Sequence, residues 1–303
     1  MQDASRFKEP LISIVMPCLN AEGYIEEALR SVLLQGCTSL ELMVVDGGST
    51  DRTVDIIKRY EPWLSWWVSE KDRGQSHAIN KGLARASGEL FNWFNADDVL
   101  CPGALLQLAE VAVRHPEAVG VCGAMSMFDS QGKETILDPV NGSREQLAFW
   151  CDPYFLPQPA SLYRTALCRE VGGVDERLHY VMDMDLVLKL AARGAFVTTE
   201  KVCARFRVHS GSKTMSNPNA VLMETIATNH NLGLDRVATE LLRRRMERHA
   251  GARIAELTEG DIAKRVDEWS LGKGALYIGR RLARSVLLRL RGVGDGSRRA
   301  REC

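Results

Sequence analysis

Short apolar runs alternate with amphipathic segments from residue 11 to residue 98, and this alternation constrains the fold more than any other feature. Apolar runs lie at residues 11–16, 41–46, 65–69 and 88–96. Between them, apolar residues recur with the 3.6-residue period of a helix. Strands that alternate with helices of roughly 10 to 15 residues form βαβ units. We therefore predict an α/β fold with a mostly parallel sheet flanked by helices.

The fourth apolar run begins at the turn residue Gly88 and ends on two adjacent carboxylates, Asp97 and Asp98. A strand in an α/β sheet delivers its C-terminal residues to the crevice where such sheets bind ligands. Two carboxylates there are hard oxygen ligands that suit Mg²⁺ or Mn²⁺. The alternative is that they form a turn, or cap the helix that follows Pro102. This stretch alone does not decide between the two interpretations.

Acidic residues follow the other apolar runs as well. Asp46 ends the second run and Asp72 follows the third. Carboxylates at neighbouring strand ends would repel one another without a ligand. They are explained if they accept hydrogen bonds from ribose hydroxyls and a base N–H, and hold a cation. The chain has neither a G-x-G-x-x-G turn after the first strands nor a P-loop, which disfavours those two classes of nucleotide site.

Composition bears on the partners and the cellular location of the protein. The net charge is zero, so no overall field favours nucleic acid as a partner. Eight cysteines are scattered without a C-x-x-C pair, which indicates buried thiols in a reducing cytosol. We expect no signal peptide from the polar N-terminus, and no apolar run reaches the roughly 18 residues of a membrane span. The predicted location is cytoplasmic.

The second half of the chain is less regular. We predict that it is helical only from about residue 220 onward. Before that point we expect a helix at 102–114, a strand at 118–125, a turn at 129–132, a loop and irregular edge strand at 154–163, helices at 165–171 and 182–193, and short strands at 196–197 and 203–208.

Five segments, in order, resemble the motifs of family 2 glycosyltransferases. Residues 13–20, 44–51 and 72–82 resemble the nucleotide-binding motifs, residues 95–98 resemble the D-x-D region, and residues 172–186 resemble the downstream acidic motif. The resemblance covers residues 10–210 and implies a GT-A fold. We therefore predict a GT-A domain at 1–215, with a nucleotide-binding half at about 10–100 and an acceptor-binding half at about 100–215. The helical pattern of the remaining residues predicts a helical C-terminal region at 216–303 with a basic amphipathic tail.

The resemblance also implies roles for individual residues. Asp46 would bind the base or ribose, Asp97 would contact the ribose and the metal shell, and Asp98 would ligate the metal. Asn95 stands where the first Asp of D-x-D often lies, so the metal site rests on Asp97 and Asp98. The implied nucleotide-sugar site comprises Pro17, Asn20, Glu22, Asp46, Asp72, Gly74, Gln75, Asn80, Lys81 and Asp97.

The resemblance favours Asp183 as the catalytic base. An inverting transfer needs one carboxylate to take the proton from the acceptor hydroxyl. Asp185 is the competitor, but residues two apart in a helix point about 200° away from each other, so only one can face the site. The alternative is that both are first-turn acids favoured by the helix dipole.

Four further residues are candidates. By the resemblance, His209 would be a metal ligand; the alternative is a purely structural histidine. Lys213 or Arg207 would neutralise the diphosphate when a loop closes. Gln158 would line the acceptor side.

The tail at 269–291 combines helically spaced apolar residues with Lys and Arg. This pattern favours a basic amphipathic helix on a membrane surface. The alternatives are an ordinary packed helix or a dimer contact.

The sequence thus predicts an inverting glycosyltransferase that depends on Mn²⁺ or Mg²⁺. The donor would be a nucleoside-diphosphate sugar, by resemblance a UDP- or dTDP-sugar. The acceptor would be a glycan or lipid-linked hydroxyl in bacterial cell-surface polysaccharide or glycolipid synthesis. A sugar nucleotidyltransferase is a rival, but residues 17–23 lack the Lys or Arg that a triphosphate needs. A non-catalytic sugar-nucleotide-binding protein is the third interpretation.

Overall fold

The computed structural model describes residues 8–150, 155–209, 211–213 and 217–250, without the side chains of residues 245–250. The chain forms two compact units. The first comprises residues 1–147 and 151–212, and the second comprises residues 148–150 and 213–303. In the described part of the chain, no helix is both long and apolar enough to cross a membrane. The predicted basic tail at 269–291 lies outside the described residues.

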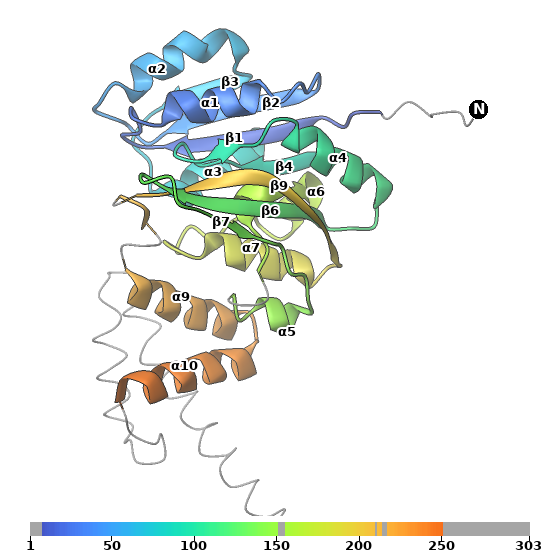
Figure 1. Ribbon diagram of the computed structural model, residues 1–303, viewed down its shortest axis with the longest axis vertical. Coiled ribbons are helices and arrows are strands. Elements are labelled where there is room, and N and C mark those ends of the chain that lie inside the picture. The colour runs from blue at the N-terminus through green and yellow to red at the C-terminus, as the bar shows by residue number, and fades with distance from the viewer. Residues whose placement is uncertain (1–7, 151–154, 210, 214–216, 251–303) are drawn as a thin grey trace, which may run out of the picture. The chain divides into compact units, whose positions relative to one another are not determined.

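Within its described residues, the first unit is built on one nine-stranded sheet of strand order β3-β2-β1-β4-β8-β6-β9-β5, with β7 paired to β6 (Figure 1). The first four strands are parallel, as predicted. The elements up to β4 are β1 (Ile12–Cys18), α1 (Ile25–Leu33), β2 (Leu40–Asp46), α2 (Thr53–Tyr60), the 3₁₀ turn η1 (Glu61–Trp63), β3 (Trp66–Ser69), α3 (Gln75–Arg85) and β4 (Leu90–Trp93).

The rest of the first unit completes a mixed sheet. Its elements are β5 (Val99–Leu100), α4 (Ala104–Arg114), β6 (Gly120–Asp129), β7 (Glu134–Leu137), α5 (Arg144–Leu147), the 3₁₀ turn η2 (Gln158–Ala160), β8 (Ser161–Arg164), α6 (Thr165–Glu170), α7 (Met182–Ala191) and β9 (Phe196–Val208). Strand β8 is antiparallel to both neighbours, β4 and β6, whereas β6 and β9 are parallel. The α/β class predicted from the sequence is confirmed.

Two predictions about strands were wrong. The strand in 154–163 was expected at an edge, but β8 lies between β4 and β6. Pro157 and Pro159 precede β8 and shape η2, so they remove no hydrogen bond from the ladder. The two short strands near 196 and 203 form one strand, β9, because register shifts between Cys122 and Met125 let its pairing with β6 continue.

The two faces of the sheet follow the two-residue period of β1. Ile12, Ile14 and Met16 belong to the core shared with α1, α2 and α4. Val15 points to the other face, against α3. Gly82 makes that contact close, because a Cβ there would lie 2.2 Å from Val15 Cγ2. Helix α3, which begins at the predicted donor residues, is thus packed directly on the sheet.

We expect Gly82→Ala to destabilise the protein by about 1–3 kcal/mol, because an added methyl group cannot fit against Val15. The sign is diagnostic, since Ala normally stabilises a helix interior by about 1 kcal/mol relative to Gly. The free energy of unfolding in urea measures the effect. Ala84→Gly, at an exposed position of the same helix, serves as the propensity control. A more stable Gly82→Ala variant would contradict the close packing.

The described part of the second unit contains two helices, α9 (Pro218–Asn231) and α10 (Asp235–Ala250), as the helical pattern predicted. Asn217 caps α9, since its side chain accepts a 3.0 Å hydrogen bond from the Ala220 N–H. Asn229 is buried, and its Nδ2 donates to the Ala148 carbonyl at 2.9 Å.

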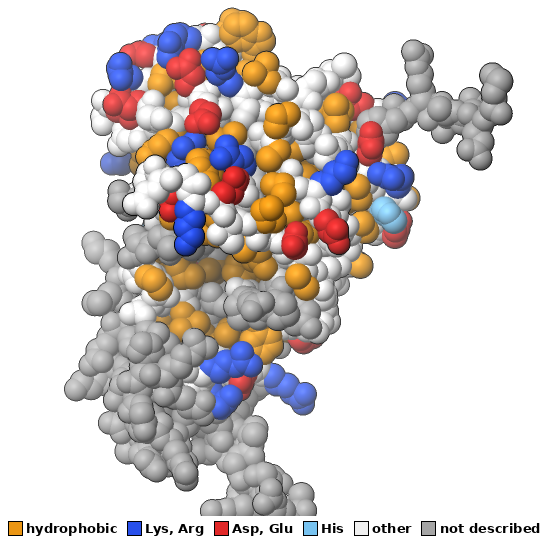
Figure 2. Space-filling model, viewed as in Figure 1, with side chains coloured by type: hydrophobic (Ala, Val, Ile, Leu, Met, Phe, Trp, Pro, Cys, Tyr) orange, Lys and Arg blue, Asp and Glu red, His pale blue; other side chains and the backbone are white. Residues whose placement is uncertain are grey.

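Surface charge is mixed. Figure 2 shows Lys and Arg interspersed with Asp and Glu over the visible face of the first unit. This pattern agrees with the zero net charge of the whole sequence.

Candidate functional site

The C-terminal ends of β1, β2 and β3 lie side by side. Cys18 pairs with Asp46, and Asp46 pairs with Ser69. Backbone hydrogen bonds extend this alignment, with Gly47 N donating to the Cys18 carbonyl at 2.9 Å and Glu70 N to the Asp46 carbonyl at 3.0 Å. The loops that carry the predicted donor residues therefore meet at one edge of the sheet. Pro17 is buried within β1 next to this edge.

Asp46 organises the loop that follows β2. Its side chain is fully buried. Oδ2 accepts hydrogen bonds from Gly48 N at 3.1 Å, Ser49 N at 2.9 Å and Ser69 Oγ at 2.6 Å, and Oδ1 accepts from the Ser49 hydroxyl. Burial and the nearby Asp46 raise the pKa of the Cys18 thiol. Asp46 was predicted to contact a base or ribose, but its carboxylate oxygens accept hydrogen bonds from the following loop and from β3.

Asn20 and Glu22 join the loops after β1 and β2. Asn20 has a φ of +50°, and its Oδ1 accepts from Thr50 N at 2.8 Å. Glu22 Oε2 accepts from the backbone N of Arg52 at 2.9 Å and from its Nε at 3.2 Å. A non-glycine residue in the left-handed region persists where the surroundings hold it, and such positions cluster at functional sites. The two loops form one hydrogen-bonded rim with both side chains exposed.

Asp72 brings a third loop to the same edge. A Cβ at Gly47 would lie 3.0 Å from Asp72 Oδ2, so the glycine permits this close approach. Asp72 Oδ1 accepts from Gly74 N at 2.8 Å, and Gly74 has the positive φ of +114° that starts α3. Lys81, also predicted at the donor site, pairs with Glu70 at 2.6 Å. Asp72 is half-buried, so its carboxylate keeps the exposed surface that Asp46 lacks.

Asp98 is buried behind the site. Its side chain is 1% exposed, and its oxygens accept from Arg207 N at 3.1 Å and Asn95 Nδ2 at 3.3 Å. Burial, followed by repulsion from Asp97, raises the pKa of Asp98 well above the usual range. Asn95 also accepts a 2.8 Å hydrogen bond from Gln75 at the start of α3. The predicted ligand role of Asp98 does not fit this position, because the carboxyl group faces the interior.

Asp97 is the exposed member of the pair. Its Oδ2 lies 3.1 Å from His209 Nε2, and its side chain is 35% exposed. His209 Nδ1 accepts a 3.1 Å hydrogen bond from Gly211 N, so Nε2 carries the proton and donates to Asp97. The imidazole also packs on the Tyr24 ring, with centroids 4.9 Å apart. Binding a cation through Nε2 requires the other tautomer, in which the Gly211 hydrogen bond is lost.

The residues present fit a cation that arrives with a diphosphate. Among the described residues, no group of three or more His, Cys, Asp or Glu side chains is placed to hold a metal ion. Mg²⁺ sites of nucleotide enzymes commonly use one or two protein carboxylates, with waters and phosphate oxygens as the other ligands. The Asp97 carboxylate suits Mn²⁺ or Mg²⁺, and His209 would add an imidazole nitrogen in its other tautomer.

Arg207 binds the backbone of Asp97 and contacts α1. Its Nη2 pairs with Glu27 at 2.6 Å, and its Nε donates to the Asp97 carbonyl at 2.9 Å. The guanidinium also lies 4.6 Å from the centre of the Phe128 ring. The predicted role of Arg207 in neutralising a diphosphate does not match these contacts.

Glu27 and Tyr24 were not predicted from the sequence. Their three-residue spacing at the start of α1 places them on one face of the helix, and this spacing was the available signal. The other candidate, Lys213, belongs to the second unit.

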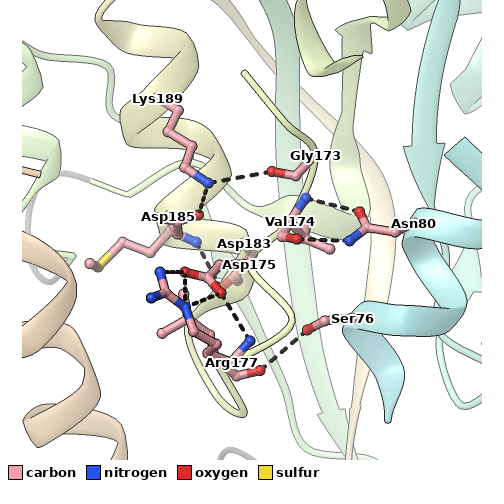
Figure 3. Close-up of polar contacts among 11 residues, drawn as sticks. Ser76, Asn80, Gly173, Val174, Asp175, Arg177, Asp183, Asp185 and Lys189 are labelled. Carbon is pink, nitrogen blue, oxygen red and sulfur yellow. Dashed lines mark hydrogen bonds and ion pairs between the residues drawn. The ribbon is translucent and has the colours of Figure 1, made fainter. Parts of the chain in front are cut away.

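The side chains of Asp183 and Asp185 point in different directions from α7, as their helical spacing predicts (Figure 3). Asp185 is buried and pairs with Lys189 at 2.6 Å, and burial raises its pKa. Asp183 is half-buried in the first turn of α7, where its Oδ1 accepts from Met184 N at 2.8 Å. Of the two carboxylates, Asp183 is the one with a surface that a substrate can reach.

Two other predicted site residues make interior contacts. Gln158 is 4% exposed, and its Nε2 donates to Asn92 Oδ1 at 2.8 Å and to the Trp93 carbonyl at 2.6 Å. It therefore does not line an acceptor surface. Asn80 binds the backbone of Val174 rather than projecting into the strand-end edge. In both cases the side-chain amide binds buried backbone groups that need hydrogen-bond partners.

The chain is similar to known glycosyltransferases in sequence. The model of glycosyl transferase family 2 matches residues 13–172. An uncharacterized glycosyltransferase of Nostoc sp. is 28% identical over 223 residues, covering 69% of this chain and 68% of the relative. A glycosyltransferase of PGL/p-HBAD biosynthesis from Mycobacterium bovis is 29% identical over 196 residues, covering 62% of this chain and 73% of the relative.

Solved structures share the fold at low sequence identity. S. aureus TarS superposes with a TM-score of 0.63 and 18% identity, over 92% of this chain and 53% of the TarS chain. The Pyrobaculum calidifontis mannosyltransferase PcManGT, in complex with GDP-Man and Mn²⁺, superposes with a TM-score of 0.57 and 20% identity, over 93% of this chain and 88% of that one. The architecture is the GT-A fold.

Proposed function

Because the model of glycosyl transferase family 2 matches more than half of the chain, the protein belongs to that family and is a glycosyltransferase, and we propose that it is inverting and metal-dependent. The observation that carries the proposal is the contact between Asp97 Oδ2 and His209 Nε2, 3.1 Å apart. It places a carboxylate oxygen beside an imidazole nitrogen that can bind a cation once its proton moves to Nδ1. The proposed cation is Mn²⁺ or Mg²⁺, held by Asp97 and His209 rather than by Asp98.

The proposed donor is a UDP-sugar, with a dTDP-sugar as the alternative. TarS has been solved with UDP and with UDP-GlcNAc, and PcManGT with GDP-Man, which supports a nucleoside-diphosphate donor. The exposed carboxylate of Asp72 would accept a hydrogen bond from the base or ribose, while Asp46 holds the adjoining loop. Gly74 and Gln75 would approach the donor at the start of α3. A bound divalent cation would neutralise the charge of the leaving diphosphate.

The proposed chemistry is a single displacement. The acceptor hydroxyl loses its proton to the Asp183 carboxylate as its oxygen forms a bond to the anomeric carbon. The bond from that carbon to the diphosphate oxygen breaks, and the electron pair leaves with the nucleoside diphosphate. Attack opposite to the leaving group inverts the anomeric configuration. Asp185 takes no part, because it is paired with Lys189.

The proposed acceptor is a hydroxyl of a glycan or lipid-linked molecule in cell-surface polysaccharide or glycolipid synthesis. The Mycobacterium bovis relative, named for PGL/p-HBAD biosynthesis, supports this setting. We also propose that residues 10–100 bind the donor and residues 100–215 the acceptor, in a cytoplasmic enzyme. In this proposal the basic sequence at 269–291 attaches to the inner membrane surface.

A panel of nucleotide sugars tests the donor proposal. We expect one UDP- or dTDP-sugar to raise the melting temperature in the presence of MnCl₂ and to do so much less in EDTA, because a ligand that binds the native state stabilises it. Nucleotide release measured on the same panel should identify the same donor. Equal stabilisation in EDTA would contradict metal dependence. Release of pyrophosphate from a nucleoside triphosphate would instead indicate a sugar nucleotidyltransferase.

A further inference from the structure

The Asn80 side chain holds one residue of the loop before α7 by both backbone groups. Its Oδ1 accepts from Val174 N at 3.1 Å, and its Nδ2 donates to the Val174 carbonyl at 2.9 Å (Figure 3). Nδ2 also donates to Glu176 Oε1 at 3.3 Å. Gly173 lets the amide approach, since a Cβ there would lie 2.5 Å from Asn80 Oδ1. The acceptor and both donor hydrogens of this amide are therefore used on the loop.

Two further side chains attach the same loop to α3 and the turn before it. Ser76 Oγ, buried on α3, donates to the Leu178 carbonyl at 3.2 Å. Arg73, just before α3, pairs with Glu176 at 2.6 Å. The attachments therefore run along the loop from Val174 to Leu178.

The loop is also tied to α7, which carries Asp183. Lys189 pairs with Asp185 and donates to the Gly173 carbonyl at 3.5 Å. Within the loop, Arg177 binds Asp175 through two donors, with Nη2 2.6 Å from Oδ2 and Nε 2.9 Å from Oδ1, which stiffens the loop. Lys189 lies in the last turn of α7, and the loop itself leads into the first turn, which carries Asp183, so the loop connects α3 to α7 (Figure 3).

The N-terminal end of α3 reaches the proposed donor site. The helix begins at Gly74 and Gln75, and Gln75 donates to Asn95 at 2.8 Å. Asn80 lies about one and a half helical turns further on. Gly82 packs α3 closely against Val15 of the sheet, so the helix is a fixed element between the two sites. A side chain that acts at this point affects the distance between donor and base without touching either.

We propose that Asn80 is a positioning residue that sets Asp183 against the donor site, and not a contact of the nucleotide sugar. This inference rests on the proposed function, because it takes Asp183 as the base. Removing the amide would release Val174 and allow α7 to shift relative to α3. Chemical steps are sensitive to such shifts, since a misplacement of about 1 Å far from the reacting atoms can cost about 100-fold in rate. Donor affinity, set by the strand-end loops, would remain.

The test measures kcat and the donor KM of the full chain with MnCl₂ and the nucleotide sugar selected from the panel, together with the Kd for UDP. Asn80→Ala is expected to lower kcat at least tenfold and to leave KM and Kd within twofold. Asn80→Asp keeps the acceptor for Val174 N but loses the donor, and is expected to fall in between. Ser76→Ala should lower kcat severalfold through the same loop. Asn217→Ala, which removes a helix-capping amide in the second unit, is the control that should leave kcat and KM unchanged.

Two outcomes would overturn the positioning role of Asn80. A tenfold rise in the donor KM or the UDP Kd of Asn80→Ala would make Asn80 a donor contact and overturn the proposal. An unchanged kcat would overturn it as well. If Asn80→Ala does not fold, the same criteria apply to Asn80→Asp and Ser76→Ala. If the wild-type chain turns over donor and Asn80→Ala leaves kcat unchanged, the proposed function stands and only this inference fails. If the wild-type chain turns over no donor, both fail.

Discussion

Asp183→Asn is expected to lose glycosyl transfer by a factor of roughly 10² to 10⁴, because the amide cannot accept the proton of the acceptor hydroxyl. The fold should persist, since Asn offers Met184 N the same oxygen acceptor that Asp183 Oδ1 provides. UDP affinity should change little, because the base acts on the acceptor. The kcat for transfer and the Kd for UDP, measured on the same preparation, separate the two effects.

Asp185→Asn is the matched control for that result. This change removes the buried carboxylate that pairs with the half-buried Lys189, so we expect a loss of about 1–3 kcal/mol of stability. Transfer at a temperature where the variant is folded should stay close to wild type. The pair thus predicts rate loss without instability at residue 183, and instability without rate loss at residue 185. An Asp183→Asn variant that keeps more than a tenth of the activity would refute the base assignment.

The neighbouring carboxylates Asp97 and Asp98 should respond oppositely to substitution. Asp97→Asn is expected to raise the Mn²⁺ concentration needed for half-maximal activity at least tenfold, because it replaces the accessible charged ligand with a neutral amide. Asp98→Asn should leave that concentration within about threefold, because its carboxyl group is buried away from the cation. Titration of donor turnover with MnCl₂ at saturating donor measures both.

Stability supplies the complementary measurement. Asp98 accepts hydrogen bonds from Arg207 N and Asn95 Nδ2, and an amide in its place can accept only one of them. Asp98→Asn is therefore expected to lose about 1–3 kcal/mol in urea unfolding. Asp97→Asn should lose less, since its side chain is partly solvated. If Asp98→Asn raised the Mn²⁺ requirement as strongly as Asp97→Asn, the original assignment of Asp98 as the ligand would be restored.

The local half of the fold was readable from residue patterns. Apolar periods of two and 3.6 identified the strands and helices up to Trp93, because each βαβ unit is formed by consecutive residues. The second half was predicted less well. Strand β8 pairs with β4 and β6, both distant along the chain, and local periodicity carries no information about such partners. The continuity of β9 likewise depends on a register shift against β6.

The candidate site shows the same division. Parallel strands end at one edge, so acids after successive strands were expected to meet there, and Asp46 and Asp72 do lie on adjoining loops. Sequence reasoning could not tell which carboxylates remain accessible. Asp46 is enclosed by its own loop, while Asp72 keeps exposed surface. Gln158 and Asn80 carry amides of the kind expected at a ligand site, yet both satisfy backbone groups of other segments.

By itself, the sequence determined the class of sheet, the family, and the edge at which the acids gather, since these follow from periodicity and motif order. Only the tertiary structure decided which of two adjacent aspartates faces outward. Burial depends on β9, which brings Arg207 over Asp98 and leads to His209 beside Asp97, more than a hundred residues along the chain. Burial disfavours the charged form of a carboxylate, so the placement of each aspartate determines its chemistry.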